Sequence, residues 1–267
     1  MHIAIISDVH SNLEALRSVL ADIRRRGIER VFCLGDIVGY SCFPHETLAV
    51  FREQGIPTVQ GNHDLMAIGE LEPDHCGPNA RKAIHWTRPL LTEEEKEFLR
   101  ALPGHLVLES DLLLVHSCLG DPVVRLSRPE QYVEQRDVVA RFDPQIRVCF
   151  YGHTHVPEVW EIHRDGGVTR LNSRRVRLGD NAFHFVNPGS VGHPRGTDYR
   201  AQYACFDLQA RTIQFHRVRY DVGKVARENA RHGLETSLGD PMLIHYGRRL
   251  ASKATRGVRR VLGSSRD

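Results

Sequence analysis

The first sixty residues alternate between two spacings of apolar side chains. Runs typical of buried strands cover residues 2–7, 30–34 and 56–60. Between them, apolar residues recur at helical spacing over residues 13–23, and a second helix is predicted over 46–54. Strands that alternate with helices form a parallel sheet, and the ligand crevice of such a sheet lies at the carboxyl ends of its strands.

The pattern of apolar residues changes in the later part of the chain. Residues 65–90 show little periodicity and predict an insertion of helices and loops, and a capping box of Thr92 with Glu95 predicts a helix over 93–101. From residue 105 onward short apolar runs predict a hairpin that turns at Ser110 and Asp111, followed by more short strands. We therefore expect two packed sheets with helices outside them.

Composition is that of an ordinary globular protein, with 267 residues of which 41% are hydrophobic and 26% charged. The net charge of +3 suits an anionic substrate or nucleic acid but is too small to select either. The six cysteines lack C-x-x-C spacing, which predicts small buried side chains in a reducing compartment, and we expect a cytoplasmic protein. The short N-terminal apolar run ends at Asp8 and indicates a strand, and no run approaches the roughly 18 residues that cross a bilayer, so no membrane partner is expected.

After Tyr220 the pattern becomes helical and then basic. We expect one domain over residues 1–246, with 221–246 as a peripheral helical segment, and a basic tail over 247–267. Such a tail is usually solvated, and the alternative is a contact with nucleic acid or another anionic surface.

Metal-ligating side chains follow the ends of the predicted strands. They are Asp8 and His10, Asp36, the trio Asn62, His63 and Asp64, then His116, and finally His153 and His155. Singly, each is typical of a turn, a helix cap or a hydrogen-bonded histidine. Together they predict a metal site, in which residues two apart on an extended backbone converge from one side.

The number and type of these ligands favour two ions that share a bridging carboxylate. Carboxylate, amide and imidazole donors without thiolate favour divalent Mn, Fe, Co, Ni or Zn over Ca or Mg.

The motifs D-x-H, GDIVGY, GNHD, a lone histidine and GH-x-H occur in this order, and together they resemble the calcineurin-like metallophosphoesterases over nearly the whole chain. NPGSVGHPR at 187–195 is similar to a stretch of the bacterial single-domain branch of that family, which includes phosphodiesterases and dinucleoside polyphosphate hydrolases. The resemblance implies an α/β fold, a four-layer α/β/β/α sandwich of two mixed β-sheets flanked by helices, with a dinuclear site at the strand ends. The loop SCFPHE after GDIVGY departs from the related proteins and leaves the substrate open.

The resemblance also implies roles for individual residues. It implies that Asp8, His10, Asp36 and His155 bind one ion. Asp36 would also bridge to a second ion, which Asn62, His116 and His153 bind. His63 resembles the catalytic histidine that binds no metal, and Asp64 the acid that orients it. Arg195 is a candidate phosphate contact or else a surface arginine, whereas His45 and His193 are expected at the surface.

The predicted activity is hydrolysis of a phosphodiester or phosphoanhydride bond in a small nucleotide, with manganese as the first choice of metal. Water bridging two ions about 3.5 to 4 Å apart becomes hydroxide near neutral pH and attacks phosphorus. His63, kept protonated by Asp64, would give a proton to the leaving oxygen. The alternatives are a protein Ser/Thr phosphatase, an enzyme that acts on nucleic acid through its basic tail, and a non-catalytic scaffold, which the complete ligand set argues against.

Overall fold

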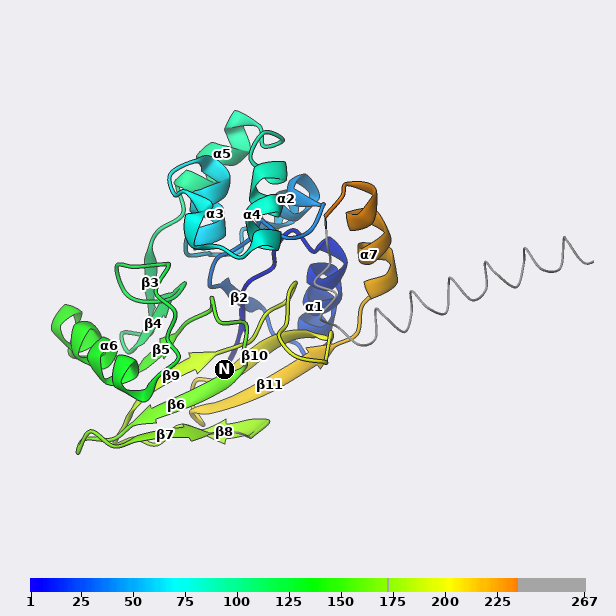
Figure 1. The fold of residues 1–267 in the computed structure, drawn as a ribbon. Coiled ribbons are helices and arrows are strands. Elements are labelled where there is room, and N and C mark those ends of the chain that lie inside the picture. The colour runs from blue at the N-terminus through cyan, green and yellow to red at the C-terminus, as the bar shows by residue number, and fades with distance from the viewer. Residues whose placement is uncertain (172, 235–267) are drawn as a thin grey trace, which may run out of the picture.

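The computed structural model describes residues 1–171 and 173–234. Two mixed β-sheets lie face to face, and helices cover the outer face of each (Figure 1). The layers therefore run helix, sheet, sheet, helix, which confirms the predicted sandwich.

The first sheet has five strands in the order β2-β1-β10-β11-β8. They are β1 (His2–Ile6), β2 (Arg30–Cys33), β8 (Arg175–Arg177), β10 (Ala201–Asp207) and β11 (Thr212–Val218). β1 is parallel to β2 on one side and antiparallel to β10 on the other. The strand that begins the chain thus lies inside the sheet, beside a strand formed about two hundred residues later.

The second sheet has six strands in the order β3-β4-β5-β9-β6-β7. They are β3 (His105–Leu108), β4 (Leu112–Val115), β5 (Val148–Phe150), β6 (Glu158–Ile162), β7 (Val168–Leu171) and β9 (Phe183–Asn187). Its three neighbouring strands β4, β5 and β9 are parallel. Their carboxyl ends consequently share one edge of the sheet.

The helices are divided between the two outer faces. On the side of the first sheet lie α1 (Leu13–Arg25), α2 (Pro44–Gln54), α3 (Asn62–Ile68), a 3₁₀ turn (Pro73–His75), α4 (Pro78–Thr87), α5 (Glu93–Arg100) and α7 (Val222–Arg231) (Figure 1). The outer face of the second sheet is covered by α6 (Pro129–Phe142), whose buried Tyr132 and Val139 pack against the strands.

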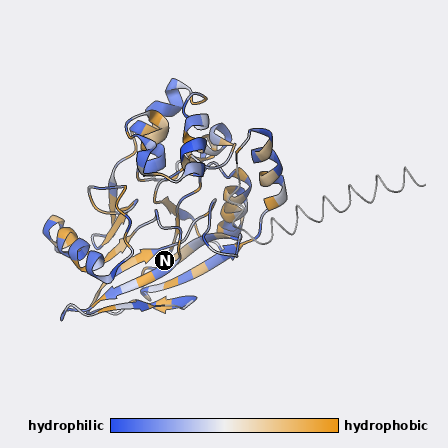
Figure 2. Ribbon diagram, viewed as in Figure 1, coloured by the Kyte–Doolittle hydropathy of each residue, from blue (hydrophilic) through white to orange (hydrophobic). Residues whose placement is uncertain are grey.

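Successive side chains along a strand point to opposite faces of the sheet and so belong to different apolar layers. In β1, Ile3 and Ile5 pack against the opposite sheet, whereas Ala4 and Ile6 pack against the helices. Both faces of the strand are buried, so its sequence is a continuous apolar run, and Figure 2 shows hydrophobic residues interleaved with hydrophilic ones on the other strands and on the helices.

The structure confirms most of the predicted elements. The capping box of Thr92 and Glu95 begins α5 as expected, and the hairpin and the later strands form at the expected positions. The predicted strand over 56–60 is wrong, because only Thr58 pairs with Cys33 as an isolated bridge and Pro57 has no N–H to extend it. Helix α6 was not predicted from the sequence.

The cysteines and the chain end add little to the fold. All six cysteines are free thiols, and five of them are buried. Helix α7 agrees with the predicted helical pattern after Tyr220, whereas residues 235–246 and the basic tail 247–267 lie outside the described residues. Among residues 1–171 and 173–234 no helix has the length and apolar character to cross a bilayer.

Candidate metal centre

The metal-ligating residues predicted at the strand ends meet at one edge of the two sheets. The first sheet supplies Asp8 and His10 after β1 and Asp36 after β2; α3 begins with Asn62, His63 and Asp64; the second sheet supplies His116 after β4 and His153 and His155 after β5. All are buried except His153, which is half-buried. The structure therefore brings together every side chain that was predicted for the site.

Five of these residues have left-handed backbone conformations. The φ angles are 54° at Asp8, 52° at His10, 54° at Asp36, 63° at His153 and 60° at His155. Our expectation that residues two apart converge along an extended backbone is therefore wrong, because each strand turns sharply as it ends. Non-glycine residues in this region cost of order 1–3 kcal/mol each and are concentrated at functional sites.

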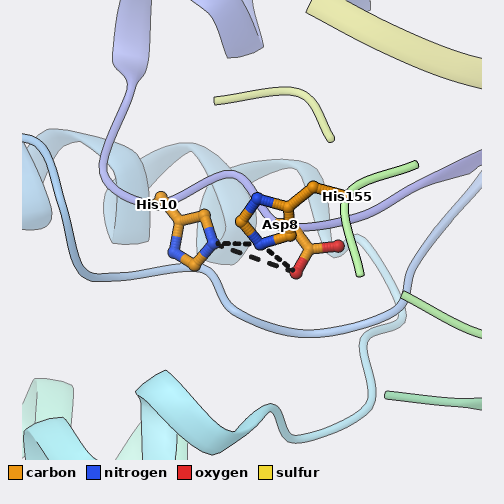
Figure 3. A group of neighbouring side chains, drawn as sticks. All are labelled: Asp8, His10 and His155. Atoms are coloured by element: carbon orange, nitrogen blue, oxygen red, sulfur yellow. Dashed lines mark hydrogen bonds and ion pairs between the residues drawn. The ribbon is translucent and has the colours of Figure 1, made fainter. Parts of the chain in front are cut away.

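Asp8, His10 and His155 form the first group of donors (Figure 3). The two imidazole Nε2 atoms are 3.1 Å apart, and Nε2 of His155 is 3.2 Å from Oδ1 of Asp8. Nδ1 of His10 is 3.2 Å from the carbonyl of Val38, and Nδ1 of His155 is 2.7 Å from that of His193. Because Nδ1 of each ring must donate to its carbonyl, both Nε2 atoms of the neutral rings present lone pairs to each other.

Asn62, His116 and His153 form the second group. Oδ1 of Asn62 lies 2.9 Å from Nε2 of His116 and 3.0 Å from Nδ1 of His153. Nδ1 of His116 donates to the carbonyl of Leu34 at 2.7 Å, so its Nε2 also presents a lone pair, here to an amide oxygen. The two imidazoles of GHTH therefore face different groups, one towards Asn62 and the other towards Asp8.

Asp36 lies between the two groups. Its Oδ2 is 3.7 Å from Nε2 of His10 and 3.4 Å from Nε2 of His116, one from each group. Burial and the charges of Asp8 and Asp64 raise the pKa of Asp36 well above its ordinary value. Burial acts on Asp8 in the same direction, but its neighbours His155 and His116 bring the pKa of that carboxyl below its ordinary value. Three buried carboxyl groups this close require compensating positive charge.

The donor set fits divalent cations. Two ligand atoms that each lie about 2.1 Å from an ion, with their bonds to it at right angles, are about 3 Å apart from each other. This is the separation between the facing donor atoms of both groups. Lone pairs that face each other at this distance repel unless a cation lies between them. Imidazole and carboxylate donors with no thiolate suit first-row transition metals.

The contacts of Asp64 differ from the predicted ones. Its carboxylate accepts hydrogen bonds from four backbone amides, those of Asp36, Ile37, Val38 and Gly61. Among the described residues Nδ1 of His63 is buried without a hydrogen-bond partner, so no such contact orients this ring through Asp64. Burial, together with His155 and His116, lowers the pKa of His63 well below its ordinary value, which also opposes the expected protonated state. Asp64 instead holds the loop that carries Asp36.

Tyr40, which from its sequence position could either line the pocket or simply pack, and His193, which was expected at the surface, both lie beside this site. The ring of Tyr40 lies between those of His63 and His193, with centroids 5.0 and 4.0 Å away and interplanar angles of 27° and 13°. The prediction of a surface position for His193 is therefore wrong, since its ring is half-buried in this stack. His45 is at the surface as predicted, where its ring contacts Glu95 at 2.8 Å.

Arg195 reaches the same stack. Its guanidinium interacts with the phenol of Tyr40, and both lie on loops that flank the metal centre. The signal available in the sequence was the position of Tyr40 directly after GDIVG and of His193 directly after NPGSVG. Neither position predicts that the two rings stack, because that depends on how the two loops meet.

Two stacked mixed sheets with imidazoles and carboxylates at one edge define a metallophosphoesterase architecture. A metallophosphoesterase from Sphaerobacter thermophilus is 35% identical, with a TM-score of 0.74 over 89% of this chain and 97% of that one. An uncharacterized protein of Methanocaldococcus jannaschii is also 35% identical, over 91% of this chain and 97% of its own length. A hypothetical protein from Pyrococcus horikoshii is similar in fold, with a TM-score of 0.69 at 18% identity over 88% and 94% of the two chains.

The chain belongs to the calcineurin-like phosphoesterase superfamily, whose domain matches residues 1–211. It is accordingly a phosphoester hydrolase, and the resemblance noted in its motifs is confirmed.

Proposed function

We propose that the protein is a dinuclear metal-dependent phosphoesterase that hydrolyses a phosphodiester or phosphoanhydride bond in a small nucleotide. This proposal rests on two places where lone pairs face each other. One is between His10 and His155 and the other between His116 and Asn62, and Asp36 lies between the two places. Each place needs its own cation, because the facing atoms have no proton to share.

The proposed ligand sets follow the two groups of donors. One ion takes Asp8, His10, His155 and Asp36, and the other takes Asp36, Asn62, His116 and His153. When bound, two such ions supply a nucleophilic water near neutral pH and neutralise charge on the phosphoryl oxygens. Manganese is our first choice of metal, since the donor set suits it as well as iron, cobalt, nickel or zinc.

The surrounding residues give each ligand a fixed orientation. Backbone carbonyls of Val38, Leu34 and His193 hold the rings of His10, His116 and His155 so that Nε2 faces the centre. The amide of His63 donates to Oδ1 of Asp36 at 2.8 Å and leaves Oδ2 directed towards the histidines.

Substrate contacts are proposed for His63 and Arg195. The imidazole of His63 is held against Tyr40 and is our candidate for the group that gives a hydrogen bond or proton to the leaving oxygen. Arg195 presents a guanidinium beside Tyr40, where it is suited to a phosphate of the substrate. A nucleotide fits this arrangement of one arginine and an aromatic stack better than a phosphoserine or phosphothreonine side chain, which offers no planar group.

The proposal is tested by measuring metal content and turnover together. With manganese added, the full chain should hydrolyse an aryl phosphodiester and hold two ions. His63→Ala should lose most turnover and keep both ions, whereas His45→Ala, a surface histidine, should change neither. A preparation that holds two ions and yet hydrolyses no phosphodiester, phosphomonoester or dinucleoside polyphosphate would refute the proposal, and loss of metal in His63→Ala would make His63 a ligand.

A further inference from the structure

A cavity of about 400 Å³ lies beside β10 and β11 of the first sheet and β7 of the second, and no candidate metal ligand lines it. Its walls come from the segment before β6, from β7 and the segment after it, and from the paired strands β10 and β11, all in the lower half of Figure 1. Pockets of a few hundred Å³ hold small organic ligands. None of the residues that define the metal centre lines this cavity.

The cavity is strongly cationic. Three arginines line it, namely Arg174, Arg200 and Arg217, and no carboxylate does so among the described lining residues. Arg200 and Arg217 share one acidic partner outside the lining, Asp198, at 2.7 and 2.9 Å. The side chain of Arg174 donates only to the carbonyl of Phe215, at 3.5 Å, among the hydrogen bonds of the described residues. Within residues 1–171 and 173–234, two of the three guanidinium charges therefore have no carboxylate to balance them.

The rest of the lining is a mixture of apolar side chains and three polar ones, Ser173, Gln202 and His216. Leu171, Pro157 and Phe215 supply apolar surface, and Phe215 is half-buried. Gln202 is only 3% exposed, and its side-chain Oε1 has no hydrogen-bond partner in the part of the chain that the structure describes. An unpaired buried carbonyl is costly, so this group gains stability when a ligand offers a donor.

We propose that this cavity is a second binding site, separate from the metal centre, for a small organophosphate. Guanidinium groups bind the phosphate in paired hydrogen bonds, the apolar wall covers the organic part, and Gln202 turns to accept from a hydroxyl or amine of the ligand. Cationic, apolar and hydrogen-bonding groups in one cavity together select this ligand class over a bare anion.

The site is also connected to the metal centre. The backbone N–H of Gln202 donates to the backbone carbonyl of Ser190 at 2.9 Å. The side-chain hydroxyl of Ser190 in turn donates to the backbone carbonyl of Asp8 at 2.8 Å. The same hydroxyl accepts from the amide of His193 at 2.7 Å. A ligand that moves Gln202 thus acts on a loop that contacts both a candidate ligand of the metal and the aromatic stack.

The test is calorimetric titration of the manganese-loaded full chain with AMP. Arg174→Ala and Arg217→Ala should each weaken AMP binding about tenfold, the effect of losing a charge-assisted contact. Arg175→Ala, the neighbouring exposed arginine that does not line the cavity, should bind like the parent. Turnover of an aryl phosphodiester without AMP should be the same in all four proteins, and circular dichroism should show that each is folded.

Several results would overturn the proposal. One is AMP binding that is absent, or that neither Arg174→Ala nor Arg217→Ala weakens. Another is inorganic phosphate binding as tightly as AMP, which would mean that the apolar wall contributes nothing. A turnover defect in Arg217→Ala with AMP binding unchanged would instead make the cavity part of the reaction at the metal centre. Each of these results leaves the assignment of the metal ligands untouched, so failure here is distinguishable from failure of the proposed function.

Discussion

Gly61 lies so close to the candidate bridging ligand that one methyl group should displace it. A Cβ added at this position would be 2.2 Å from Oδ1 of Asp36 and 2.3 Å from its backbone nitrogen. The backbone of Gly61 is extended, with φ at −98°, so alanine is acceptable there in conformation and the conflict is purely steric. Since non-bonded atoms settle at about 3.5 Å, Asp36 and residue 61 must move apart by about 1 Å in Gly61→Ala.

The energetic cost follows from this displacement. Overpacking of this kind costs about 1–3 kcal/mol, and in a chain of this size each kcal/mol lowers Tm by about 2–4 °C. Misplacing a residue that orients metal ligands typically costs about 10–100-fold in metal affinity, and Asp36 is proposed to serve both ions. We expect Gly61→Ala to lose both metals at concentrations that saturate the parent.

Thermal unfolding and metal content measured after dialysis provide the assay. Gly104→Ala is the matched control, because a Cβ there meets no atom within 4 Å and its φ is not positive. If Gly61→Ala retained both ions and the Tm of the parent, the reasoning would be refuted, since Asp36 would then not be held where the structure has it.

Three further predictions concern single side chains. His153→Ala and His155→Ala should each lower the affinity for a different one of the two ions. Titration with a metal whose spectrum differs between the two sites would show which ion each variant loses, and loss of both ions in both variants would contradict the separate ligand sets. Asp64→Asn places an amide donor against backbone donors and should destabilise the fold by about 2 kcal/mol in urea unfolding, and an unchanged midpoint would contradict its role. Hydrogen bonding from Arg200 lowers the pKa of Asp198 to about 2, so its contribution to stability is complete above the unfolded pKa and is lost as the pH falls towards 2. Asp198→Asn should therefore unfold about 1 kcal/mol more easily at pH 6, after allowance for solvent screening, and like the parent near pH 2; an equal difference at both pH values would contradict this.

The sequence predicted those features that depend on local patterns. Apolar runs such as the one before Asp8 identified the strands, and the metal-ligating side chains at their ends predicted where the site would lie. The two packed sheets with helices outside them and the helix begun by Thr92 depend on the same local signals, the four-layer sandwich was implied by the family resemblance, and all are present in the structure.

The features that sequence did not predict depend on contacts between distant segments. Asp64 is bound by amides of a loop that lies 26 to 28 residues earlier in the chain, and nothing in GNHD distinguishes that arrangement from a contact with His63. The stack of Tyr40 on His193 joins loops about 150 residues apart. Left-handed turns at residues such as His155 have no propensity signal, because the surrounding fold imposes them.

The place of β10 beside β1 also governs when the centre is completed during synthesis. Asp8 and His10 leave the ribosome first, yet the strand that precedes them has its second neighbour only when residues 201–207 have been made. Until then one edge of β1 has no partner, and the loop of Ser190 that supports Asp8 has no anchor on Gln202. The candidate ligands that are made earliest therefore gain their full support last, and we expect the site to be complete only after β10 has been translated.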